Sequence, residues 1–141
     1  MRQHHRTEQG ATSITQTVIV APALLFALML IVQFGLMFHA ANVAENAAQQ
    51  GGAAARRFDG TEAAARTRAG DYLASVNGTL SDTAVTVHRT AQTASVTVTG
   101  TVVPLVPWVR LHVAETASGP VERYVPPSGE FANSEGSSGG N

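Results

Sequence analysis

The feature that most constrains this chain is an uncharged apolar run, which extends from Val18 to Phe38 and reads VIVAPALLFALMLIVQFGLMF. At about 1.5 Å of rise per residue, a helix of this run is roughly 31 Å long, which matches the hydrocarbon core of a bilayer. A soluble helix of that length needs a polar face, and this run has none. The run therefore predicts one membrane-spanning helix, with the lipid bilayer as the first expected partner.

Composition restricts what the rest of the chain can do. The chain has 141 residues and a formal net charge of −1, and its basic residues are all arginines without a cluster, so no nucleic-acid partner is expected. It has no cysteine, hence no disulfide, thiolate metal site or cysteine nucleophile. The roughly 70 residues outside the anchor and tails form a small domain with a modest core. A partner surface is therefore expected, rather than a cleft for a small-molecule substrate.

Helical signals continue beyond the apolar run. Alanine-rich sequence without a breaker extends the first helix to about Arg57, and Gly51-Gly52 is expected to loosen it. Thr61 has the residue type of an N-cap, and the next residues place apolar side chains on one helical face. Asn77-Gly78 is expected to end this second, amphipathic helix.

From Thr83 the apolar period changes to two, which predicts strands. The expected strands cover residues 83–89, 93–102 and 109–115, and a fourth short strand is possible at 121–124. The chain is thus expected to have an α+β fold with a small three- or four-stranded antiparallel sheet. The expected organisation is a leader at 1–12, a transmembrane helix at 13–57, an extracytoplasmic α+β domain at 58–125 and a disordered, Pro/Gly/Ser-rich tail at 126–141.

Three interpretations compete for the apolar run itself. A cleaved secretory signal has a shorter apolar region and small residues at its cleavage site, whereas Phe38 stands where a small residue is needed. A plain transmembrane anchor is the physical default. The third interpretation is a pilin-type amino terminus, in which the short leader stays in the cytoplasm and the folded part lies outside the plasma membrane.

The residues around the run favour the third interpretation. A short charged leader, small residues before the run, Pro22 inside it and Phe34-Gly35 near its far end resemble the amino-terminal segment of TadE-like proteins. These are pseudopilins of the tight-adherence branch of type IV pilus systems. The resemblance covers about residues 9–57, and an alanine-rich extension with an arginine pair is similar to actinobacterial members.

The resemblance implies leader processing and helix assembly. A prepilin peptidase would cut near Gly10 or Ala11, so that the mature chain starts at Ala11 or Thr12. The family's acidic residue falls on Gln16, which can form hydrogen bonds but cannot supply a negative charge to a neighbouring amino terminus. Other pilin or pseudopilin helices and the pilus assembly platform are the implied partners.

Two further features of the first helix suggest contacts with other helices. Small residues recur every fourth position at Ala40, Ala44, Ala48 and Gly52. This spacing lets helix backbones approach closely, although alanine-rich helices also produce it by chance. Gln33 places an amide inside the apolar run, where a missing hydrogen bond is costly. A partner helix is the favoured ligand for this amide, and interfacial water is the alternative.

The sequence contains no recognisable catalytic motif, and we expect neither an enzyme nor a cofactor. His88 and His112 are expected on the solvent face of the sheet, without the further ligands that a metal site needs. Trp108 is expected to pack over the edge of the sheet, and the alternative is an exposed contact with a partner or the bilayer surface.

These observations predict a minor pseudopilin-like component of a tight-adherence (type IVc) pilus assembly or secretion system. It would be a single-pass protein of the plasma membrane before it enters the surface pilus. The alternative is an unprocessed single-pass membrane adaptor that binds an envelope partner through its exposed sheet.

Overall fold

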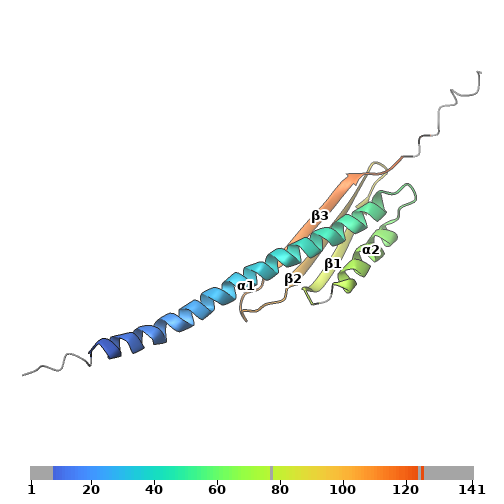
Figure 1. Ribbon diagram of the computed structural model, residues 1–141. Coiled ribbons are helices and arrows are strands. Elements are labelled where there is room, and N and C mark those ends of the chain that lie inside the picture. Colours follow the sequence, from blue (N-terminus) through green and yellow to red (C-terminus); the bar gives the residue numbers. More distant parts are fainter. Residues whose placement is uncertain (1–7, 77, 124, 126–141) are drawn as a thin grey trace, which may run out of the picture.

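A computed structural model describes residues 8–76, 78–123 and 125, with side chains from Gln16 onward (Figure 1). It confirms a long apolar amino-terminal helix, a second helix and a three-stranded antiparallel sheet. The elements are α1 (Glu8–Arg56), α2 (Glu62–Ser75), β1 (Leu80–Arg89), β2 (Thr93–Val102) and β3 (His112–Pro120). Residues 8–12 of the expected leader belong to α1. The rest of that leader and the expected tail at 126–141 lie outside the described residues.

The sheet has the strand order β1-β2-β3, and both helices cover the same face of it (Figure 1). The carboxyl-terminal half of α1 lies along β2 and β3, and α2 lies beside α1 over β1. Val96 in the central strand pairs with Val87 on one side and Ala117 on the other, and all three are buried. The period-two pattern therefore correctly predicts the two faces of the sheet, because the valines face the helices and the threonines face away.

Three strand predictions differ from the structure. The first strand begins at Leu80 rather than residue 83, and the third ends at Pro120 rather than residue 115. The third strand begins at His112 rather than residue 109, because the preceding chain turns, with the Val109 N–H donating to the Val106 carbonyl. The possible fourth strand is wrong for residues 121–123, and Tyr124 lies outside the described residues. The Val121 N–H donates to the Gln92 carbonyl and the Glu122 N–H to the Arg56 carbonyl, so the backbone leaves the sheet ladder.

The core between α1 and the sheet is built from small side chains. Ala44, Ala48 and Val96 are fully buried in it. Gly51 does not loosen α1, which is continuous to Arg56. A Cβ on Gly51 would lie 3.0 Å from the Ala65 carbonyl oxygen of α2, so glycine here permits close packing between the two helices.

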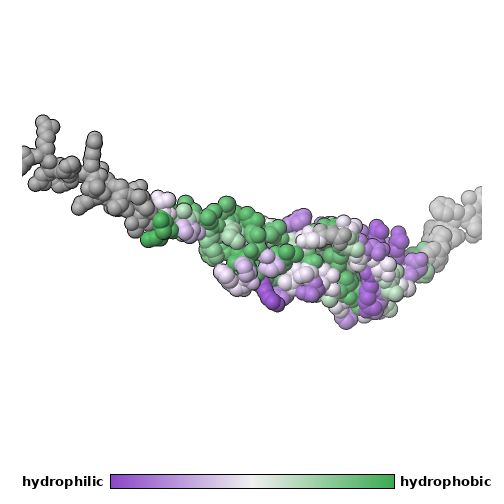
Figure 2. Space-filling model, turned by 90° about the horizontal axis from the view of Figure 1, so that it is seen from below, coloured by the Kyte–Doolittle hydropathy of each residue, from purple (hydrophilic) through white to green (hydrophobic). Residues whose placement is uncertain are grey.

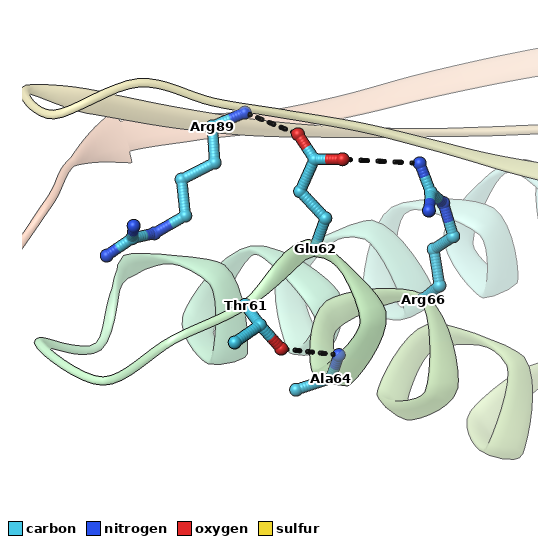
Figure 3. Close-up of polar contacts among 5 residues, drawn as sticks. All are labelled: Thr61, Glu62, Ala64, Arg66 and Arg89. Carbon is cyan, nitrogen blue, oxygen red and sulfur yellow. Dashed lines mark hydrogen bonds and ion pairs between the residues drawn. The ribbon is translucent and has the colours of Figure 1, made fainter.

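A polar cluster closes the junction between the two helices (Figure 3). As predicted, Thr61 caps α2, its Oγ1 accepting a hydrogen bond of 3.1 Å from the Ala64 N–H. Glu62 accepts from the backbone N–H of Arg89 at 3.3 Å. The Arg89 guanidinium donates to the Ala55 carbonyl at 2.9 Å and to the Arg57 carbonyl at 3.3 Å. A cation thus caps the carbonyl end of α1 and ties β1 to it.

Gly60, in the turn between α1 and α2, has no room for a side chain, because an added Cβ would meet the carbonyl oxygens of Ala54 and Ala55. We expect Gly60→Ala to lower the free energy of unfolding by about 1–3 kcal/mol, since backbone must shift to accept the methyl group. The matched control is Gly70→Ala within α2, where an added Cβ meets nothing within 4 Å. The control should raise stability by about 0.5–1 kcal/mol. Urea unfolding of the full chain in detergent micelles, followed by circular dichroism, measures both, and equal stability of the two variants would contradict this account.

Candidate membrane and assembly surface

The amino-terminal half of α1 carries apolar side chains that the rest of the chain leaves uncovered. Figure 2 shows hydrophobic residues gathered over this part of the molecule and hydrophilic residues concentrated toward the opposite end. From Gln16 onward the helix meets the length and hydropathy expected of a membrane span, with a mean hydropathy of 2.5 in its most apolar window. Its exposed large side chains are Val18, Ile19, Val20, Leu24, Leu25, Phe26, Leu28, Met29, Ile31, Val32, Phe34, Leu36 and Phe38.

Gln33 marks the point where this exposed surface meets the folded domain. Its side chain is only 1% exposed. Its Oε1 accepts hydrogen bonds from the backbone N–H groups of Leu105 at 2.6 Å and Val106 at 3.3 Å, both in the connection between β2 and β3. The ligand of this amide oxygen is thus a loop of the same chain, rather than the partner helix or the water that the sequence suggested. The Gln33 Nε2 has no hydrogen-bond partner among the described residues.

The connection from residue 103 to residue 111, called here the β2–β3 loop, is held in a fixed shape. The Val102 N–H donates to the Leu111 carbonyl at its base, and the Val106 side chain is buried. Trp108 is 76% exposed, so the expectation that it packs over the sheet edge is wrong. Val103 and Leu105 are also exposed, and the loop therefore presents apolar side chains outward while Val106 points in.

The small-residue stripe has a partner within the chain. Ala40, Ala44 and Ala48 are each 0% exposed and belong to the core that α1 forms with the sheet. The spacing does allow close approach, but the surface that approaches is the chain's own sheet. In the described structure this stripe is not available to a neighbouring pilin helix.

The remaining predicted assembly residues lie on the open part of α1. Gln16, Pro22, Phe34 and Gly35 are all exposed. A Cβ on Gly35 would meet nothing within 4 Å, so no contact within the chain requires glycine there. The predicted processing residues Gly10, Ala11 and Thr12 have helical backbone in α1, and their side chains lie outside the described set.

The structure separates the two strand histidines. His88 is opposite Ser95 and His112 is opposite Thr101, so they flank the central strand at positions far apart along it. Both are exposed, as expected. Within the described residues, no three His, Cys, Asp or Glu side chains lie close enough to hold a metal ion.

Sequence reasoning missed two polar contacts that fix this arrangement. The Gln33 amide was recognisable as unusual, but its partner lies 72 residues away and uses only backbone N–H groups, which carry no sequence signal. The contacts of Arg89 with the end of α1 could likewise not be predicted from the sequence, because the acceptors are backbone carbonyls. For Arg89, the sequence feature that could have suggested these contacts is its position at the end of a predicted strand.

We expect Gln33→Leu to free the β2–β3 loop, because leucine fills similar space but cannot accept the two backbone hydrogen bonds. Leaving those N–H groups without a partner costs about 1–3 kcal/mol, so hydrogen exchange in the loop should accelerate about 5- to 150-fold. Exchange measured by mass spectrometry on micelle-bound protein tests this. The control is Val32→Leu, at an exposed position of the same helix. Unchanged loop protection in Gln33→Leu would show that packing of Val106 alone holds the loop.

The family model described as TadE-like protein matches residues 10–53, which include all of the predicted processing and assembly residues. Comparison with curated proteins and with solved structures gives no match. The match ends inside α1, before α2 and the sheet. The amino-terminal segment of this chain, residues 10–53, is thus similar to the TadE-like family, as its motifs predict.

Proposed function

We propose that this chain is a minor pseudopilin-like structural component of a tight-adherence (type IVc) pilus assembly system. The observation that carries this proposal is the division of α1 into two halves. The half from Gln16 to Val32 is mostly apolar and exposed, whereas the half from Ala40 to Ala55 buries one face, which includes Ala44 and Ala48, in the core that it forms with the sheet. The TadE-like match spans the exposed half and most of the buried one.

An exposed apolar helix needs a non-aqueous environment, and two are available to a pilin-type subunit. Before assembly the amino-terminal half of α1 lies in the bilayer, where its aliphatic and phenylalanine side chains contact lipid. During assembly the same surface packs against the helices of other subunits. Gly35 supports this second contact, because it is exposed and allows another backbone to approach closely.

The proposal includes a topology. The amino terminus lies in the cytoplasm, where a prepilin peptidase removes the leader at Gly10 or Ala11, and the sheet lies outside the plasma membrane. Gln16 then stands near the mature amino terminus with an amide in place of a carboxylate. The role is structural, in initiating, priming or capping a fibre, and no catalytic step is assigned to the chain.

Leader processing is tested on protein isolated from native membranes. We expect an intact mass that corresponds to a chain beginning at Ala11 or Thr12, and the loss of this species in cells without the peptidase. Replacing the small residues, as in Gly10→Leu with Ala11→Leu, should block processing while leaving the fold of residues 58–123 intact. A chain that keeps Met1 in peptidase-competent cells would contradict the pseudopilin assignment.

Helix assembly is tested with single cysteines, because the chain contains none of its own. We expect Phe34→Cys, on the exposed face of α1, to crosslink to a second pilin-like subunit in intact membranes. The control is Gln92→Cys, which is also exposed but lies at the far end of the sheet. Crosslinking should be lost when the other pilin subunits are deleted.

The membrane adaptor remains the second candidate, because the threonine-bearing face of the sheet is not covered by any described element of the chain. Thr86 is exposed on this face. An adaptor predicts the opposite crosslinking pattern, with capture of an envelope protein by Thr86→Cys and no pilin crosslink from Phe34→Cys. That pattern, together with an intact leader, would replace the pseudopilin proposal.

A further inference from the structure

We infer that the β2–β3 loop is a second membrane contact, which rests in the bilayer interface with Trp108 among the lipid headgroups. This inference rests on the proposed membrane insertion of α1. It adds that the folded domain itself touches the membrane at a defined level. The occupant of the exposed apolar loop surface is then lipid of the outer leaflet.

Gln33 sets the position along α1 at which the β2–β3 loop meets the membrane. Because the Leu105 and Val106 N–H groups bind its side chain, the loop is fixed beside this position of α1. Figure 1 shows the loop reaching from the sheet toward the amino-terminal half of α1. The bilayer surface therefore cannot lie far beyond Gln33 without immersing the loop and the adjoining ends of β2 and β3.

The sequence of α1 fits a boundary at this level. A hydrocarbon core of about 30 Å, measured back from Gln33 at about 1.5 Å per residue, reaches residue 13. No Asp, Glu, Lys or Arg occurs between Ser13 and Gln33. This core begins and ends five residues before the apolar run at Val18–Phe38, so the last turn of that run, from Phe34 to Phe38, lies in the interfacial layer.

The loop has the side chains of an interfacial segment. Trp108, Leu105 and Val103 are exposed and apolar, and the Leu105 backbone N–H fixes their loop beside Gln33, which lies between the exposed residues Val32 and Phe34 of α1. Tryptophan combines an apolar ring with one N–H donor, which suits the boundary between acyl chains and headgroups. Arg110 is exposed two residues later and carries the positive charge that anionic headgroups attract.

Trp108 is the single tryptophan of the chain, so the unmodified protein reports its own depth. The experiment measures fluorescence of the full chain in vesicles of phosphatidylcholine with a minority of phosphatidylglycerol. A share of the lipid carries bromine either near the glycerol end of the acyl chain, as a shallow quencher, or near the methyl end, as a deep quencher. We expect the shallow quencher to reduce Trp108 emission more than the deep one.

Two relocated tryptophans, each in a Trp108→Phe background, are the controls. Leu24→Trp places the ring on exposed α1, about 13 Å below Gln33, and should respond most to the deep quencher. Gln92→Trp places it at the other end of the sheet, roughly 30 Å away along β2, and should respond to neither quencher.

The outcomes separate this inference from the proposed membrane anchor. If Leu24→Trp is quenched and Trp108 behaves like Gln92→Trp, the anchor stands and the loop contact is overturned. If Trp108 responds mainly to the deep quencher, the boundary at Gln33 is wrong. If Leu24→Trp escapes both quenchers, α1 is not in the bilayer, and the anchor and the loop contact both fail.

Discussion

Close packing between the small residues of α1 and the central strand is the constraint on which the rest of the structure depends. Ala44, Ala48 and Gly51 leave the helix backbone near the sheet, and Val96 and Val98 fill the space between them. A larger side chain on this helical face would push the helix away and open the small core. One continuous helix, α1, therefore packs against the sheet with its carboxyl-terminal half and exposes apolar side chains along its amino-terminal half.

The change between these environments occurs over a few residues. At Gln33 the helix is hydrogen-bonded to the β2–β3 loop, Phe34 and Phe38 are still exposed, and from Ala40 one face of the helix is buried against the sheet. An amide suits this position because its oxygen can satisfy backbone N–H groups that no strand partner reaches. The loop binds the helix with backbone N–H groups, so the Gln33 side chain joins the exposed part of α1 to the folded domain.

Much of this fold could be predicted from periodicity and capping. Apolar length identified α1, Thr61 marked the start of α2, and period-two valines located β1 and β2. The start of β3 was misplaced because Val109 and Leu111 continue the alternating pattern through a stretch that the structure folds as a turn. The exposure of Trp108 and the burial of the alanine stripe against the sheet could not be predicted. Whether these side chains are buried depends on which other part of the chain packs against them. Spacing specifies a face, and only the tertiary arrangement specifies its partner.

The direction of α1 relative to the strands has a mechanical consequence. Because the helix lies along β2 and β3, a pull on its amino-terminal end loads the contacts of the buried half in parallel, as shear, rather than one after another. At the far end the Arg89 guanidinium holds the Ala55 carbonyl and resists the same displacement. A force along the axis of α1 is therefore distributed over the whole helix–sheet interface, and the helix and the sheet move together as one body.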